Sequence, residues 1–247
     1  MDGRFDDLAQ HAAAHHGLFR SSDAARFGVS RQEVRTLVGS GWCEVLRPGV
    51  YRVAAAPATG RQALLAEVWS HPEGAVVSHR AAGYLHLLVG FRVPRPEVTL
   101  PFGQNQRGRH RVHVSLRLPA AHLVIRDSIP TTSVARTLFD LAGVEPKGRV
   151  EVALDDALAR RLCTLRQVNQ VFFALARRGR RGSAAMRELM EDRGEGYVPP
   201  ASALERLARK VIADHALPSP QFEVHLGDEE WIGRVDFERT LRTKAVV

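Results

Sequence analysis

The sequence predicts an α+β fold, in which helical and strand patterns follow one another irregularly along the chain. Apolar residues recur at helical spacing in several segments, for example at Leu64, Leu65, Val68 and Trp69. In residues 112–118 and 222–226 they alternate with polar residues, which is typical of strands. Two segments rich in small residues, Gly and Pro, 54–60 and 194–200, indicate linkers. We therefore expect three parts, residues 1–56, 61–193 and 201–247.

The composition indicates a globular protein with an excess of positive charge, which favours an acidic binding partner. The chain has 247 residues and a formal net charge of +8, most of which falls in the middle of the chain. A basic surface suits nucleic acid, because phosphate binding releases counterions. No run reaches the roughly 18 apolar residues of a membrane span. The acidic residues near Met1 do not fit a signal peptide, so we expect a cytoplasmic protein without membrane contact. The two cysteines, Cys43 and Cys163, fit neither a disulfide framework nor a zinc site.

Residues 1–56 are expected to form three helices followed by a hairpin. A short turn, Gly28-Val29, separates a helix that begins near Ser21 from one that begins at Ser30. Ser30 and Glu33 have the spacing of a capping box, which fixes the start of the third helix. This order predicts a winged helix-turn-helix, with 42–46 and 50–53 as the strands of the wing.

The third helix is the predicted reader of double-stranded DNA. Its apolar residues share one face, which leaves an opposite polar face that can contact base edges and phosphates. We also expect arginines of the wing to reach the backbone or the minor groove. The candidate DNA-binding residues are Ser30, Arg31, Gln32, Arg35, Thr36, Arg47 and Arg52. The alternative is a three-helix unit that binds only protein, and the net charge of +1 in this part keeps that alternative open.

The central part is expected to mix helices with strands. Helices are predicted around 61–69 and 80–88, a strand at 112–118, and a helix that Pro130-Thr131-Thr132 starts. Two or three further helices are expected within 147–193. His79 and His86 fall on one face of the second helix, but with no Glu or Cys expected beside them we predict packing rather than metal binding. The basic segments 107–111 and 177–181 have two equally weighted interpretations, as phosphate contacts or as solvated turns.

Three motifs resemble those of AbiEi-type antitoxins from type IV toxin–antitoxin systems. The first is the series Gly28-Val29-Ser30, Gly41 and Leu46-Arg47-Pro48-Gly49-Val50-Tyr51; the others are the segments 78–82 (SHRAA) and 129–142 (IPTTSVARTLFDLA). The resemblance covers residues 5–193. It implies a transcriptional autoregulator that binds repeats in its own promoter. It also implies that the protein neutralises a nucleotidyltransferase-like toxin without a stable complex.

Residues 201–247 resemble part of the restriction-endonuclease-like domain related to very-short-patch-repair endonucleases. The resemblance rests on a helix that starts at Ser202, strands around 222–226 and 232–237, and an acidic residue on the helix and on the second strand. It implies Glu205 and Asp236 as catalytic residues, with Asp236 as a ligand of Mg²⁺. The third element of that motif would follow Val247, and Lys244 lies early for the family's lysine. We therefore expect an incomplete nuclease domain, and Mg²⁺ only where that domain is complete.

The sequence is compatible with three functions. The leading prediction is a DNA-binding transcriptional regulator that resembles a type IV antitoxin and is not an enzyme. The second is a metal-dependent DNA endonuclease that the winged helix directs to its target. The third is a protein-interaction module. For Glu205 the capping box with Ser202 is a sufficient structural explanation. For Asp236 an exposed strand position or an ion pair would explain it as well.

Overall fold

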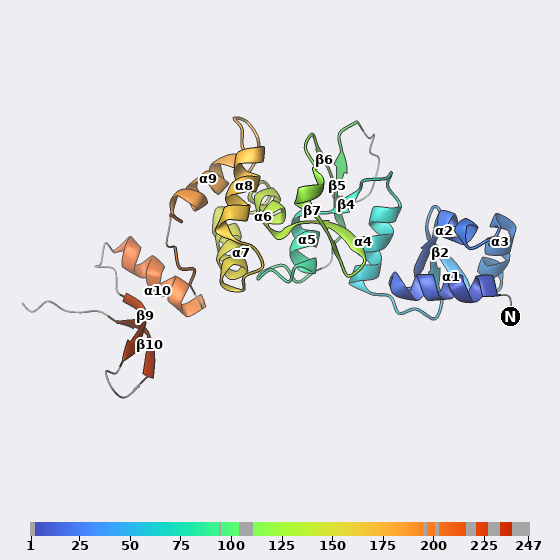
Figure 1. The fold of residues 1–247 in the computed structure, drawn as a ribbon, viewed down its shortest axis with the longest axis horizontal. Coiled ribbons are helices and arrows are strands. Elements are labelled where there is room, and N and C mark those ends of the chain that lie inside the picture. Colours follow the sequence, from blue (N-terminus) through green and yellow to red (C-terminus); the bar gives the residue numbers. More distant parts are fainter. Residues whose placement is uncertain are drawn as a thin grey trace, which may run out of the picture. The chain divides into compact units, whose positions relative to one another are not determined.

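The computed structural model describes residues 3–93, 95–103, 111–194, 197–200, 203–215, 221–226 and 233–238. Helices and sheets are combined in these residues, which confirms the predicted α+β class (Figure 1). The chain divides into two compact units, Met1–Tyr197 and Val198–Val247, and the division falls within the predicted linker 194–200. Among the described residues, no helix is long and apolar enough to cross a membrane.

The N-terminal domain is a winged helix-turn-helix, as predicted. Its helices are α1 (Gly3–Ala14), α2 (Ser21–Arg26) and α3 (Arg31–Gly39), and its strands are β1 (Leu18–Arg20), β2 (Cys43–Arg47) and β3 (Val50–Val53). The strands form an antiparallel sheet in the order β1-β3-β2. The sequence pattern missed β1, since three residues are too few to show alternation. Most of the buried apolar residues of the domain form one cluster: Leu8, Ala12, Phe19, Ala24, Val29, Val34 and Cys43.

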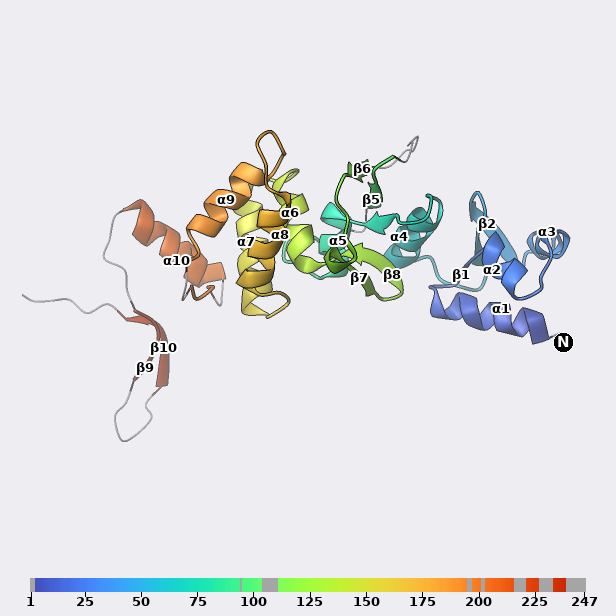
Figure 2. The ribbon, with the colours of Figure 1, turned by 45° about the horizontal axis from the view of Figure 1, so that its top comes forward.

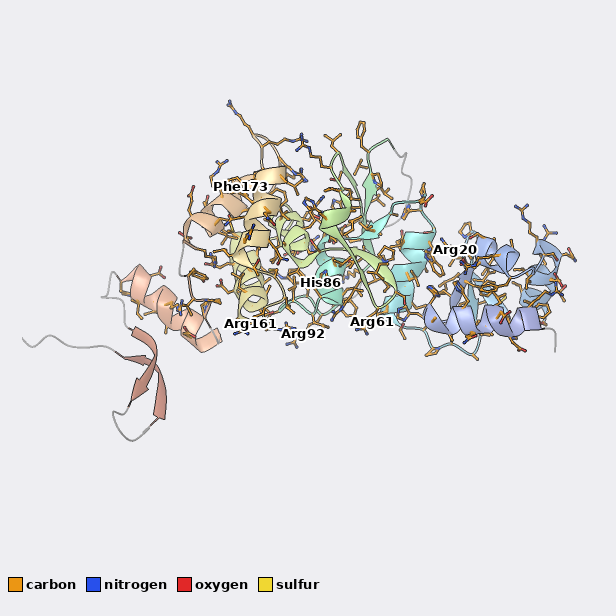
Figure 3. All side chains as sticks on the ribbon, viewed as in Figure 1. Arg20, Arg61, His86, Arg92, Arg161 and Phe173 are labelled. Carbon is orange, nitrogen blue, oxygen red and sulfur yellow. The ribbon has the colours of Figure 1, made fainter. Side chains whose placement is uncertain are left out.

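This domain continues into the central part without a break in packing. Helix α4 (Gly60–Trp69) follows the wing, and its Leu64 and Leu65 lie in the same apolar cluster as Leu18 and Val50. The guanidinium of Arg20, which lies beside α4 in Figure 3, is 4.8 Å from the centroid of the Trp69 ring. The domain boundary between residues 56 and 61 therefore remains a prediction.

The central part is built on a five-stranded mixed sheet in the order β6-β5-β4-β8-β7. These strands are β4 (Val76–Val77), β5 (Glu97–Pro101), β6 (Arg111–Ser115), β7 (Leu123–Arg126) and β8 (Ile129–Thr132), joined by α5 (His79–Leu85) and a 3₁₀ turn (Ala120–His122). Strands β5/β6 and β4/β8 pair in parallel, and β4/β5 and β7/β8 antiparallel. The predicted helix start at Pro130–Thr132 is wrong: these residues belong to β8, and Ser133 caps the helix that follows.

Four helices then form a second core on one side of this sheet, as Figure 2 shows. They are α6 (Val134–Ala142), α7 (Lys147–Ala159), α8 (Leu165–Leu175) and α9 (Ser183–Glu191). The predicted two or three helices of 147–193 are thus confirmed as three. Their shared apolar cluster includes Leu138, Leu154, Val168 and Leu189, which are fully buried.

The second unit contains helix α10 (Ala203–Asp214) and an antiparallel hairpin of β9 (Gln221–Leu226) and β10 (Gly233–Glu238). The predicted helix and both predicted strands are present. Ser202, residues 227–232 between the two strands, and Lys244 lie outside the described residues.

Gly182 offers a direct test of how tightly α6 and α9 pack. It has a φ of +84°, and a Cβ at this position would lie 2.8 Å from the Gly143 nitrogen and 3.1 Å from the Phe139 oxygen. Both are backbone atoms that cannot move aside easily. We expect Gly182→Ala to lower the free energy of unfolding by more than about 2 kcal/mol, since the left-handed conformation alone costs roughly 1–2 kcal/mol for a non-glycine residue.

Gly179→Ala is the matched control. Gly179 has a φ of +79°, but nothing lies within 4 Å of the added Cβ. This variant should show only the conformational cost. Urea unfolding of both variants measures the difference, and equal losses would mean that the close approach at Gly182 does not exist in solution.

Candidate nucleic-acid interface

Helix α3 presents the polar face that the sequence predicts. Val34 is buried in the domain core, and Leu37 and Val38 are half-buried against it. The residues on the opposite face are all exposed: Arg31, Gln32, Arg35 and Thr36. The helix lies on the side of the N-terminal domain away from α4 in both ribbon views (Figures 1 and 2). The polar face of α3 is therefore accessible to a large ligand such as double-stranded DNA.

A capping box fixes the first turn of α3. Ser30 Oγ accepts a hydrogen bond from the Glu33 backbone nitrogen at 3.2 Å, and the Ser30 backbone nitrogen donates to Glu33 Oε2 at 2.7 Å. The bond from the Ser30 backbone nitrogen is the main cause that holds the pKa of the Glu33 carboxyl below its usual value of 4.5. The Arg4 side chain, from α1, donates to the Gly28 carbonyl at 2.7 Å. The turn before α3 is thus held from two sides, which keeps the helix in a defined position.

The two wing arginines lie next to carboxylates of the same chain. Arg47 Nη2 lies 3.7 Å from Glu67 Oε2 of α4, and Arg52 Nη2 lies 2.6 Å from Glu44 Oε1 on the neighbouring strand. Arg31 and Arg35 differ from them: among the described residues, neither has an ion-pair partner. Contact of Arg31 and Arg35 with DNA would therefore break no ion pair of the described residues, whereas the wing arginines would have to share or give up theirs.

A groove adjoins the exposed face of α3. It lies between α2 and the start of α3, has a volume of about 570 Å³, and its lining includes Ser22, Ala25, Arg31 and Tyr51. Gly49, in the turn of the wing, has a φ of +73°, which suits the tight Arg47-Pro48-Gly49 connection. All seven predicted DNA-binding residues thus lie on α3, its cap or the wing, and their contact with DNA remains a prediction.

A cluster in the central part overturns one expectation. His79 was expected to have no Glu beside it, but the fold brings Glu97 of β5 and His113 of β6 next to it. One potential ligand atom of each residue lies within 4.8 Å of the other two. The prediction failed because Glu97 and His113 are distant in sequence and meet only through the parallel pairing of β5 with β6. His86, by contrast, is a buried residue whose Nε2 lies 2.7 Å from the Thr132 carbonyl oxygen.

The cluster borders a small polar cavity of about 230 Å³. His79 and His113 line it together with Thr99, Ser115 and Arg136. The two imidazole rings stack with centroids 3.5 Å apart. Burial, followed by the charges of nearby residues, holds the pKa of His79 well below its usual value, so this imidazole is neutral at physiological pH.

The two predicted nuclease residues lie in the second unit. Glu205, on α10, is 6% exposed and forms an ion pair with Arg209 one turn later on the helix. It belongs to no group of potential metal ligands among the described residues. Asp236 lies in β10, and its side chain is outside the described part of the chain. The catalytic and metal-binding roles of both residues remain predictions from the resemblance.

Comparison with known proteins now adds to this geometry. Residues 6–54 match the family model described as "Transcriptional regulator, AbiEi antitoxin". Two proteins of Mycobacterium tuberculosis, "Uncharacterized protein MT2308" of strain CDC 1551 / Oshkosh and "Uncharacterized protein Rv2248" of strain H37Rv, are each 31% identical over 225 residues. That alignment spans 85% of this chain and 74% of each relative. The chain belongs to their family, and its N-terminal domain is of the AbiEi antitoxin type.

A solved structure, that of the RV2827C protein from Mycobacterium tuberculosis, is also similar to this chain. The TM-score is 0.45 and the sequence identity 16%, over 80% of this chain and 84% of that one. The AbiEi-type match ends at residue 54, near the end of β3. It therefore runs from within α1 to just past β3 and includes the exposed face of α3, and it leaves the His79 cluster and the second unit outside it.

Proposed function

We propose that this chain binds double-stranded DNA through α3 and regulates transcription of its own operon as an antitoxin of the AbiEi type. The exposed face of α3 carries the proposal. Its arginines, Arg31 and Arg35, form no ion pair within the described residues, and its amide and hydroxyl side chains, Gln32 and Thr36, offer hydrogen bonds to base edges. The family model that matches this domain describes transcriptional regulators.

The wing supports the same function. A hairpin that follows a recognition helix can contact the DNA backbone, and backbone contacts fix the register of the helix without reading sequence. Arg47 and Arg52 are placed on this hairpin, although Glu67 and Glu44 compete for them. We infer that α3 supplies specificity and that the wing adds a smaller, salt-sensitive contribution.

The role as an antitoxin gives the proposed partner. We infer a functional link to a nucleotidyltransferase-like toxin, encoded beside this chain, and action in the cytoplasm, where operon DNA is found. Control of transcription needs no stable complex of the two proteins, since a change in the level of the regulator is enough to change expression of both.

Fluorescence anisotropy of labelled DNA tests the proposal. The full chain is titrated into DNA from upstream of its gene and into a scrambled duplex, each at several salt concentrations. We expect affinity for the upstream DNA to exceed that for the scrambled duplex by at least about 10³-fold, with a steep fall as salt rises. Equal, weak binding to both would contradict a regulator and favour a module that binds protein.

A further inference from the structure

We propose that His79, Glu97 and His113 bind a divalent metal ion, and that this ion is Zn²⁺. The three residues come from the start of α5, from β5 and from β6, and their potential ligand atoms lie within 4.8 Å of one another. The inference is independent of DNA binding, because the cluster belongs to the central part of the chain and not to the winged helix.

The donor set favours a transition metal such as zinc over Mg²⁺ and Ca²⁺. Two imidazole nitrogens and one carboxylate oxygen are a set that Zn²⁺ takes in sites with three protein ligands, whereas Mg²⁺ and Ca²⁺ prefer oxygen donors throughout. Such a site keeps a fourth position for water or another ligand. His79 and His113 both border the cavity of about 230 Å³, which has room for that fourth ligand.

Neighbouring groups hold two of the three ligands in place. Ser78 Oγ lies 2.9 Å from His79 Nδ1 and accepts a hydrogen bond from Thr99 Oγ1 at 2.8 Å. With Nδ1 engaged in this way, His79 presents Nε2 to an ion. The Arg80 backbone nitrogen donates to Glu97 Oε2 at 3.1 Å, so Oε1 is the carboxylate oxygen nearer to His113. Outer partners of this kind orient the ligands of protein metal sites.

The spacing requires only small movements. His113 Nε2 donates to Glu97 Oε1 at 2.9 Å. Neighbouring ligand atoms around Zn²⁺ lie roughly 3.3 Å apart when each bond is about 2.0–2.1 Å long. The stacked rings of His79 and His113 differ in orientation by 16°, so the His113 ring must turn before both nitrogens can point at one ion. Its side chain is 29% exposed on the edge strand β6, which leaves it free to turn.

Arg80 competes for the same carboxylate. Its Nη1 lies 3.3 Å from Glu97 Oε1, but its guanidinium also donates to the Glu145 carboxylate and to the Val144 carbonyl. Arg80 therefore keeps two partners when Oε1 turns to the ion. His79 itself has a φ of +51°, in the left-handed region that a histidine rarely adopts. Strained backbone of this kind persists only where the surrounding structure holds it, and it is frequent at ligand-binding sites.

Zinc binding to the full chain, freed of metal with a chelator, tests the proposal. Competition with a zinc-sensitive dye should show that the unaltered chain binds one Zn²⁺ ion tightly. Glu97→Gln and His113→Ala should each weaken that binding by more than about 100-fold, because loss of a ligand should exceed the 10–100-fold effect typical of outer partners. Thermal unfolding of the metal-free variants checks that each is folded, and Glu97→Gln preserves the shape of the site if His113→Ala does not fold.

His15→Ala is the matched control. The ring of His11 on α1 and that of His15, just after the end of α1, lie 4.2 Å apart, which makes them the other close pair of imidazoles among the described residues. This variant should bind Zn²⁺ as the unaltered chain does. Co²⁺ in place of Zn²⁺ should give the visible absorption of a tetrahedral site in the control and not in Glu97→Gln. Absence of a tight equivalent in the unaltered chain, unchanged binding in both cluster variants, or loss of binding in His15→Ala would each overturn the proposal.

Discussion

Replacing Arg31 and Arg35 together by alanine is expected to abolish sequence-specific DNA binding while leaving the chain folded. Both side chains are exposed on α3, and neither forms an ion pair within the described residues. A well-placed arginine–base contact contributes about 1–3 kcal/mol of discrimination. Two such contacts together contribute about 2–6 kcal/mol, so their loss corresponds to a fall in affinity of roughly 30-fold to more than 10⁴-fold, a range that includes the whole preference of about 10³-fold expected for the upstream DNA. Anisotropy titration against the upstream DNA measures the fall, and the preference over a scrambled duplex should disappear with it.

A second double variant separates specific contacts from overall charge. Arg166 on α8 and Arg187 on α9 are exposed helical arginines outside the winged helix. Arg166→Ala with Arg187→Ala removes the same two charges and should leave specific binding nearly unchanged. Both double variants should unfold at the same temperature as the unaltered chain, since surface substitutions usually change stability by less than about 0.5 kcal/mol. Equal losses of affinity in the two would mean that charge alone, and not α3, accounts for binding.

Much of the winged helix could be predicted because its signals are local. The capping box of Ser30 and Glu33 requires only a spacing of three residues, and the structure has it. The inward face of α3 follows from helical periodicity, and Val34 is indeed buried. The short strand β1 could not be predicted in this way, because Leu18–Arg20 is defined only by its pairing with β3.

The central sheet was predicted poorly because its strands, like β1, are defined by their pairing with one another and not by a local pattern. Val76–Val77 forms a two-residue strand in the middle of the sheet, and no periodic pattern exists in two residues. Thr131 and Thr132 were assigned to a helix, yet they are fully buried in β8. The His79 cluster depends on the parallel pairing of β5 with β6 and on the place of the first residue of α5 beside them, which no local pattern encodes. Contacts of this kind are decided by tertiary structure, which sequence periodicity does not describe.

The segment 129–142 carries part of the family resemblance. It contains a buried ion pair that could not be recognised from its sequence pattern. Its Arg136 and Asp140 form a buried ion pair on α6. Arg136 Nε lies 2.9 Å from Asp140 Oδ1, and the guanidinium also donates to the Arg117 carbonyl at 3.0 Å and to Ser115 Oγ at 3.1 Å. The helical spacing of four residues permits the pair, but burial determines how much the pair contributes to the free energy of unfolding.

The second large effect is expected from breaking this pair. Asp140→Ala leaves the Arg136 guanidinium buried without its carboxylate, and Arg136 is only 1% exposed. We expect this variant to lower the free energy of unfolding by about 3–5 kcal/mol, the cost of an uncompensated charge in a protein interior. Urea unfolding measures the loss. Arg136→Met combined with Asp140→Leu removes both charges and should recover much of it, because apolar residues of similar volume often replace a buried pair without loss.

An exposed pair of the same spacing shows why burial governs the size of this effect. Arg160, the C-cap of α7, and Asp156 on α7 are also four residues apart, with side chains 42% and 21% exposed. Asp156→Ala should cost less than about 1 kcal/mol, since water screens the charges and solvates the arginine that remains. Similar losses in Asp140→Ala and Asp156→Ala would mean that water reaches Arg136. In that case the α6 helix would be held by its apolar face, including Leu138 and Leu141, and the charged pair would contribute little to the stability of the central part.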